Sequence, residues 1–134
     1  MSGNLNVSQT TGIVTKDNGI VVCTTAFMGN NYRPDTNPTG IKGRNNPLMQ
    51  DVHFIGPLPQ GVYRVGEWGM HHPVGDLSAP LTQIAGETYG RNAFFIHGPG
   101  GADPENSSEG CIVIPHNDRV AVAALQPETI TVTA

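Results

Sequence analysis

Two apolar runs decide how this sequence is interpreted: Phe94-Phe95-Ile96-His97-Gly98 and, after a polar glycine-rich stretch, Ser107-Ser108-Glu109-Gly110-Cys111-Ile112-Val113-Ile114. An apolar strand ends at a histidine, a loop leaves the sheet, and a cysteine preceded by a glycine opens the next apolar strand. The layout predicts two neighbouring strands whose ends carry His97 and Cys111.

The rest of the chain is predicted to be mainly β-structure. Val, Ile and Thr number 33 against 15 for Leu and Ala, and this balance favours strands. Asp17-Asn18-Gly19 predicts a tight hairpin turn with positive φ at Asn18 and Gly19. Pro115 to Leu125 predicts one short helix near the C-terminus, capped by residues 115–118 and stopped by Pro127. Further strands are expected at 5–8, 12–16, 20–27, 62–67 and 129–133, the first three as a meander.

Composition predicts a single domain over residues 1–134. A chain of 134 residues with 37% hydrophobic residues can build one ordinary core without a disulfide or metal. The net charge of −4, with no basic cluster, argues against a nucleic-acid partner. Because no apolar run approaches the length of a membrane helix, we expect no membrane insertion. The first residues lack the pattern of a signal peptide, so we expect synthesis in the cytoplasm without a leader.

His97 and Cys111 are the candidate catalytic pair. An imidazole beside a thiol can take its proton and make a nucleophile. The alternative is a structural histidine and a small buried cysteine. Gly98 and Gly110 favour catalysis, because a missing side chain lets a ligand approach the backbone. The order His before Cys disfavours papain-like peptidases.

Other features have simpler interpretations. Cys23 lies in an apolar run and is predicted to be inert packing. The irregular stretch 28–47 is expected to border the active site. Trp68, with Tyr63 and Met70 nearby, could line a glycan groove, but core packing is favoured.

The His97 and Cys111 segments resemble the active-site signature of the L,D-transpeptidase (YkuD-like) superfamily, cysteine enzymes that cut or cross-link peptidoglycan stems. The resemblance is closest to the small signal-less branch delivered as effectors by type VI secretion. It covers residues from about Gly43 to Arg119, in the ordered blocks Asn45-Asn46-Pro47, Gly56-Pro57-Leu58-Pro59-Gln60-Gly61, Gly90-Arg91 and the signature itself. It implies a β-sandwich or curved mixed sheet, no metal and no cofactor.

The resemblance also implies roles for individual residues. Cys111 would be the nucleophile and His97 the base, with Ser108 orienting the imidazole unless it only caps a loop. Backbone N–H groups near Gly110 would hold the oxyanion. Family members often carry Arg two residues after the cysteine and His before the Gly-Cys pair, where this chain has Val113 and Glu109. The candidate substrate contacts are therefore Gly98, Glu109 and, for a carboxylate, Arg91 or Arg119, although each arginine also fits a surface ion pair.

The implied reaction begins with attack of the Cys111 thiolate on the L-centre carbonyl of meso-diaminopimelate in a tetrapeptide stem, which displaces D-alanine. Water would then complete a carboxypeptidase reaction, and an amine would complete a transpeptidase reaction. The implied partners are peptidoglycan stems, the secretion apparatus and an immunity protein, and the implied location is the target-cell periplasm.

Two rival functions remain at this stage. A zinc hydrolase could use His53, His71 or His72, and His97, with Cys111 as a fourth ligand. Adjacent histidines on a strand point to opposite faces, and no HExxH motif is present. A non-catalytic peptidoglycan-binding module would instead leave Cys111 unreactive.

Overall fold

The computed structural model describes residues 3–29, 42–52, 55–71, 74–99 and 110–134, which form a curled mixed sheet with one α-helix. The prediction of a mainly β fold with a short helix near the C-terminus is confirmed. The strands are β1 (Asn4–Ser8), β2 (Val14–Lys16), β3 (Val21–Cys23), β4 (Phe27–Met28), β5 (Gly61–Val65), β6 (Gly69–His71), β7 (Gly75–Gly86), β8 (Phe94–His97), β9 (Ile112–Val113) and β10 (Thr129–Thr133). The helices are η1 (Pro47–Met49), a 3₁₀ turn, and α1 (His116–Ala124).

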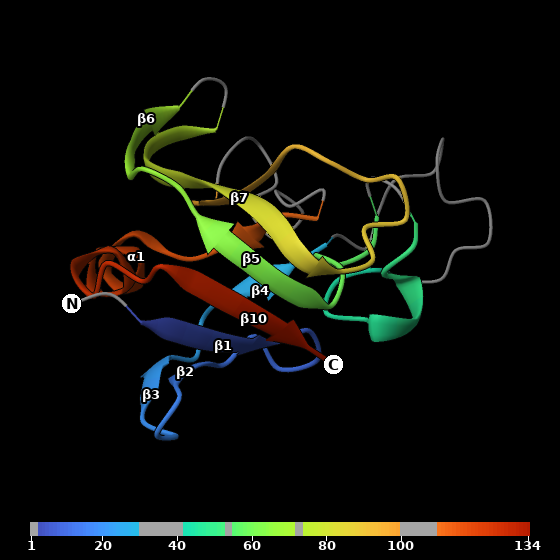
Figure 1. Ribbon diagram of the computed structural model, residues 1–134, viewed down its shortest axis with the longest axis horizontal. Helices are drawn as coiled ribbons and strands as arrows, with labels where there is room; N and C mark the ends of the chain where they lie inside the picture. Colours follow the sequence, from blue (N-terminus) through green and yellow to red (C-terminus); the bar gives the residue numbers. More distant parts are fainter. Residues whose placement is uncertain (1–2, 30–41, 53–54, 72–73, 100–109) are drawn as a thin grey trace.

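The sheet follows the order β3-β2-β1-β10-β5-β7-β8-β9-β4, and β6 pairs with β7 outside this path. β1 runs parallel to β10, and β8 runs parallel to β9. Figure 1 shows the first strand, β1, beside the last strand, β10. The two ends of the chain therefore pair with each other inside the sheet. The parallel pair β8 and β9 brings together the two runs that contain His97 and Cys111.

The core lies against one face of these strands. Alternate residues of β1 and β10 are buried, as are Phe94 and Ile96 of β8. Ile112 of β9 and Ile114 just after it join the same cluster. Phe94 meets Tyr63 of β5 edge to face, with ring centroids 5.9 Å apart. Since burying each large apolar side chain stabilises by roughly 1.5–3 kcal/mol, this cluster fixes which face of β8 and β9 turns inward.

The first three strands form the predicted meander, with a different turn. β2 pairs with both β1 and β3 in antiparallel fashion. Within the turn Gly19 has a φ of 88°, but Asn18 does not have a positive φ. The Asn18 side chain instead accepts a hydrogen bond from the Ile20 backbone N–H at 3.1 Å. The prediction of positive φ at both residues is therefore wrong at Asn18.

The predicted strand over 20–27 is in fact two strands at opposite ends of the sheet order. β3 pairs with β2, whereas β4 pairs with β9. Only Thr24 and Thr25 interrupt the apolar run, and because threonine is itself common in strands, the pattern does not mark the point where the chain changes partners. β6 and the twelve-residue β7 were not predicted, because β7 contains Pro80 and several exposed positions that interrupt a strand pattern.

The helix forms where it was expected, without the expected side-chain cap. Pro115 occupies the N-cap position and makes no side-chain cap hydrogen bond. Asp118 accepts a hydrogen bond from the Thr25 hydroxyl instead, and this bond ties α1 to the segment between β3 and β4. In the part of the chain that the structure describes, no helix has the length and apolar content needed to cross a membrane.

Cys23, Tyr63 and Trp68 are packed in or against the core, whereas Met70 is not. Cys23 is buried in the core, and burial raises the pKa of its thiol. Tyr63 is fully buried, and Trp68 packs against the core with its indole nitrogen buried and without a partner among the described residues. Met70 is exposed on β6. Core packing is therefore confirmed for Cys23, Tyr63 and Trp68 but not for Met70.

Candidate active site

His97 ends β8, and Cys111 directly precedes the neighbouring strand β9. In the β8–β9 register Ile96 faces Ile112 and His97 faces Val113. Because Ile96 and Ile112 point into the core, the alternate residues point to the opposite side. We call this side the site face; its members are Phe95 and His97 of β8, Val113 of β9, and Phe27, the β4 partner of Val113.

His97 and Cys111 are separated by one strand spacing and two residues along the strand. Neighbouring strands lie about 4.8 Å apart and rise about 3.3 Å per residue, so the Cα atoms of Cys111 and His97 are about 8 Å apart on a diagonal. The register confirms that the two runs form neighbouring strands, and the pairing of His97 with Cys111 stays a prediction.

The Cys111 thiol is held at the edge of β8. Its sulfur accepts a hydrogen bond from the Phe95 backbone N–H at 3.3 Å and lies 3.7 Å from the Ala93 carbonyl oxygen. The residue is partly exposed, in contrast to the buried Cys23. Cys111 is therefore the more accessible of the two thiols, and a backbone donor already faces its sulfur.

The ring of His97 is oriented by its neighbour in the chain. Its Nδ1 lies 2.8 Å from the carbonyl oxygen of Gly98. A carbonyl oxygen can only accept, so Nδ1 donates and the lone pair of the neutral ring is on Nε2. Among the described residues, the carbonyl of Gly98 orients the ring of His97. Ser108 and Glu109 lie outside the described residues.

The environment of His97 favours the neutral ring. Burial is the main cause that lowers its pKa, and the nearby charge of Arg119 lowers it further. The hydrogen bond with Gly98 opposes these effects, but the net shift is downward. A neutral imidazole with an available Nε2 is the state that a general base requires at neutral pH.

Arg119 of α1 packs against the backbone beside His97. Its guanidinium donates to the carbonyl oxygens of Leu77 at 3.0 Å and Ile114 at 2.8 Å, and only 5% of the residue is exposed. A Cβ atom on Gly98 would lie 2.9 Å from Cζ of Arg119 and still closer to Nη1. Gly98 is therefore required for the arginine to fit.

Arg91 packs against Gly110, the glycine before Cys111, as Arg119 packs against Gly98. Its guanidinium donates to the carbonyl oxygens of Gln50, Pro57 and Gly56 at 2.6–3.0 Å. A Cβ atom on Gly110 would overlap its Nη2, and Gly110 has a φ of 122°. Burial lowers the pKa of Arg91, while the charges of Tyr63, Cys111 and Asp51 act in the opposite direction.

These positions revise the expectations for the two arginines and the two glycines. Arg91 and Arg119 are each about 5% exposed and donate to backbone carbonyls, so neither is a surface ion-pair residue. Their guanidinium groups fill the spaces beside Gly110 and Gly98 that were expected to admit a ligand. The structure therefore gives both arginines a positioning role inside the fold.

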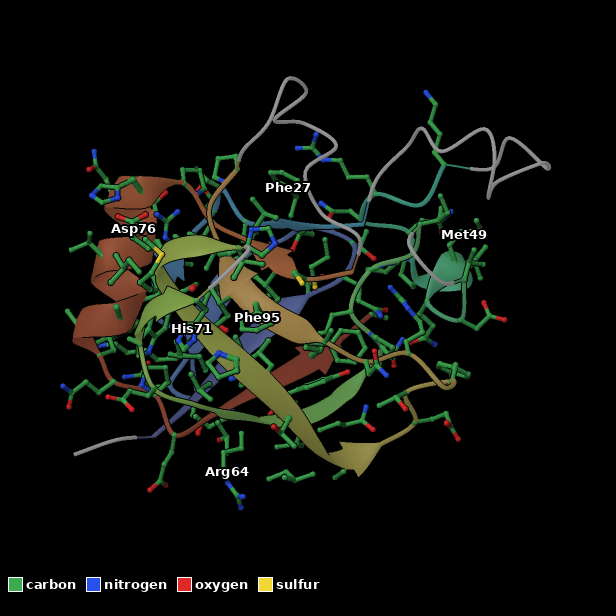
Figure 2. All side chains as sticks on the ribbon, turned by 90° about the horizontal axis from the view of Figure 1, so that it is seen from above. Phe27, Met49, Arg64, His71, Asp76 and Phe95 are labelled. Carbon is green, nitrogen blue, oxygen red and sulfur yellow. The ribbon has the colours of Figure 1, made fainter. Side chains whose placement is uncertain are left out.

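Sequence reasoning missed two residues at the site face. Arg44 places its Cζ 4.0 Å from the centre of the Phe27 ring. Phe95 lies between Cys111 and the β6 hairpin, with its ring 5.8 Å from that of His71, and Figure 2 shows these two rings side by side. The alternation of residues 94–97 could have placed Phe95 beside His97. No local pattern indicated Arg44, because its contact depends on how residues 42–46 pack against β4.

The histidines of the zinc hypothesis are only partly described. Among residues outside the undescribed segments, no three His, Cys, Asp or Glu side chains gather closely enough to hold a metal ion. His71 has its Nε2 2.8 Å from the carbonyl oxygen of Glu67. His53 and His72 lie outside the described residues.

The described site thus has a thiol and an oriented imidazole in two neighbouring parallel segments, with a buried guanidinium against each adjacent glycine. A thiol and an imidazole are the groups that nucleophilic acyl transfer by cysteine uses. Comparison of the chain with protein-family models, curated proteins and solved structures gave no match.

Proposed function

We propose that this protein is a cysteine-dependent L,D-carboxypeptidase or L,D-transpeptidase that acts on the tetrapeptide stems of peptidoglycan. The observation that carries the proposal is the orientation of His97. Its Nδ1 lies 2.8 Å from the Gly98 carbonyl oxygen, which leaves the lone pair of the neutral ring on Nε2, and Cys111 precedes the neighbouring strand. The choice of peptidoglycan as substrate rests on the resemblance of the residue blocks from about Gly43 to Arg119.

The proposed reaction has two stages. Nε2 of His97 takes the thiol proton of Cys111, and the sulfur attacks the L-centre carbonyl carbon of meso-diaminopimelate. The tetrahedral intermediate collapses, the bond to D-alanine breaks, and His97 returns the proton to the leaving amine. A thioester remains on Cys111. Water, a stem amine or a free D-amino acid then attacks it and gives hydrolysis, cross-linking or exchange.

The oxyanion of each intermediate needs fixed donors near Cys111. The resemblance makes backbone N–H groups at Gly110 and Cys111 the candidates. Such donors are effective because they are oriented before charge develops on the substrate oxygen.

The proposed setting is antibacterial. Trimming or exchanging stems removes the donors that ordinary cross-linking requires, which suits a type VI secretion effector acting in a rival's periplasm. A producing cell would need an immunity protein. This setting rests on the family resemblance alone.

Mass spectrometry of purified tetrapeptide muropeptides tests the activity. We expect the wild-type protein to release D-alanine, form a cross-linked dimer or exchange the terminal residue. Cys111→Ala should abolish every product, whereas Cys23→Ala, which alters only the buried core thiol, should keep them. Products formed equally by Cys111→Ala would overturn the cysteine mechanism. Products lost on adding a chelator would favour the zinc hydrolase.

A non-catalytic peptidoglycan-binding module predicts a different pattern. Wild type and Cys111→Ala would both bind muropeptides, and both would leave them unchanged under reducing conditions. That result would replace the enzymatic proposal with the binding function.

A further inference from the structure

Arg119 of α1 completes a ring of contacts around His97. Its guanidinium donates to the carbonyl oxygen of Ile114 at 2.8 Å, and the Ile114 N–H donates to the carbonyl oxygen of His97 at 2.9 Å. The same guanidinium occupies the space that a Cβ atom on Gly98 would fill, and the Gly98 carbonyl oxygen accepts from Nδ1 of His97. Arg119 therefore touches the residue that holds the backbone of His97 and the residue that holds its ring.

The guanidinium also joins the two strands that flank β8. Its Nε donates to the carbonyl oxygen of Leu77 in β7, two residues before Ala79, the register partner of Ile96. Its Nη1 donates to Ile114, which directly follows β9 on the other side of β8. Arg119 thus spans the end of β8, where His97 is the last residue.

The place of Arg119 in the helix is unfavourable for a cation. Arg119 lies in the first turn of α1, and the N-terminal end of a helix carries a partial positive charge that disfavours a basic side chain. Only 5% of the residue is exposed, so its charge has also lost most of its contact with water. The contacts at the end of β8, rather than any benefit to the helix, therefore explain why a guanidinium is held here.

The charge of Arg119 acts on the protonation of His97. Burial is the main cause that lowers the pKa of His97, and the guanidinium lowers it further because two positive charges repel each other. Other titratable or charged groups described on the elements around His97 are Asp76 of β7, His71 of β6, Cys111 before β9, Arg44 on Phe27 of β4, and His116 and Asp118 of α1. Among the described residues, Arg119 supplies the charge that lowers the pKa of His97.

We infer that Arg119 is a positioning residue for His97, which keeps the imidazole neutral and the lone pair of the ring on Nε2. It acts on the orientation of the ring through the Gly98 backbone and on its protonation through charge. The role requires no contact between the guanidinium and a substrate. The inference rests on the proposed function in one respect, since the base that Arg119 serves is the base of that reaction.

The wild-type protein provides the first test. Nuclear magnetic resonance of protein labelled with ¹⁵N-histidine measures the tautomer and the protonation midpoint of each imidazole, and His97→Gln assigns the signals of His97. We expect the neutral ring of His97 to carry its proton on Nδ1, with a midpoint below that of an ordinary histidine. A proton on Nε2 in the neutral ring, or a midpoint above the ordinary value, would overturn the inference.

Variants then separate the charge of Arg119 from its packing. Arg119→Met removes the charge and keeps an unbranched chain, so the midpoint of His97 should move to higher pH and its two tautomers should mix. Arg119→Lys keeps the charge, so the midpoint should stay close to that of wild type. Arg64→Met, which changes an exposed arginine on β5, is the matched control and should alter neither property.

An unmoved midpoint in Arg119→Met, or an equal upward shift in Arg119→Lys, would refute the role of the charge. Thermal unfolding verifies that each variant folds. If Arg119→Met does not fold, Arg119→Gln replaces it, because an amide keeps two N–H donors without the charge. The same upward shift is expected there, and its absence would equally refute the inference.

Turnover of tetrapeptide stems gives a second readout. A base must be neutral to accept a proton, so the acid limb of kcat/KM should lie at higher pH in Arg119→Met than in wild type. At neutral pH we expect kcat to fall about 10- to 100-fold in Arg119→Met, because the base is misplaced. The KM should change little, and a loss confined to KM would indicate substrate binding and contradict a positioning role.

The two readouts distinguish this inference from the proposed reaction. A shifted midpoint in Arg119→Met, without turnover by wild type, would support the positioning role and contradict catalysis. Turnover that depends on Cys111, together with an unmoved midpoint in Arg119→Met, would do the reverse.

Discussion

The guanidinium of Arg119 lies directly against the α-carbon of Gly98, so the residue after the candidate base cannot carry a side chain without displacing the arginine. The same arginine donates to the carbonyl oxygens of Leu77 and Ile114. Gly98 also accepts the hydrogen bond from His97. Gly98 therefore contacts both Arg119 of helix α1 and the imidazole of His97.

Gly98→Ala should destabilise the protein and misplace His97. The added methyl group overlaps the guanidinium, and displacing it strains the chain and breaks hydrogen bonds to buried carbonyls. We expect the free energy of unfolding in urea to fall by about 2–4 kcal/mol. Gly69→Ala is the control, because nothing lies within 4 Å of a Cβ atom there. An equal loss in both variants would contradict the role of the arginine contact.

Arg91→Met should loosen the segment that precedes β5. Three backbone carbonyls, of Gln50, Gly56 and Pro57, lose their donor in this variant. Because buried carbonyls without partners are costly, we expect a loss of about 2–5 kcal/mol in unfolding free energy. Hydrogen exchange should also increase in residues 55–60. Arg64→Met, which changes an exposed arginine, should remain near wild type. Retention of wild-type exchange in Arg91→Met would refute this structural role.

The free energy of unfolding should decrease when the pH falls below the ordinary pKa of histidine. Burial lowers the pKa of His97 in the folded protein, so the unfolded chain binds a proton at higher pH than the folded chain. Folding is thus favoured fully above about pH 6.5, and the unfolding free energy declines as pH drops below this value toward the folded pKa. The slope contributed by one group is at most about 1.4 kcal/mol per pH unit.

His97→Gln should remove this acid-side slope. His71→Gln, which changes a partly exposed histidine on β6, should keep it. Urea unfolding between pH 5 and 8 measures both variants. An unchanged slope in His97→Gln would assign the acid sensitivity to other groups.

The two thiols should differ in their rate of modification. Cys23 is 5% exposed, and burial raises the pKa of its thiol, so little reactive thiolate is available. Cys111 is partly exposed at the end of β9. A thiol reagent near pH 7.5 should therefore label Cys111 rapidly, whereas Cys23 should react only after denaturation. Mass spectrometry of tryptic peptides locates the label.

Cys111→Ala should abolish the rapid phase, and Cys23→Ala should leave it unchanged. Rapid labelling of Cys23 in the native protein would show that the core around β3 opens readily. Slow labelling of Cys111 would count against an activated nucleophile and in favour of the binding module.

The sequence by itself determined the parts of this protein that depend on local pattern. Apolar alternation located β1, β5, β8 and β10, and the proline-bounded run located α1. Because strand residues alternate between faces, the sequence also placed His97 and Cys111 at neighbouring strand ends. It failed at β4 and β7, where a β-favouring run that includes Thr24 and Thr25 hid a change of partner and Pro80 obscured a strand.

Only the tertiary structure decided what surrounds the candidate pair. Gly98 supplies a carbonyl that orients His97, and this bond depends on the backbone path after β8. Arg91 and Arg119 turned inward because Gly110 and Gly98 leave room for them, whereas Arg44 reached the site face through the packing of its loop on β4. These contacts join residues distant in the chain, and no local spacing encodes where a long cationic side chain finds its acceptors.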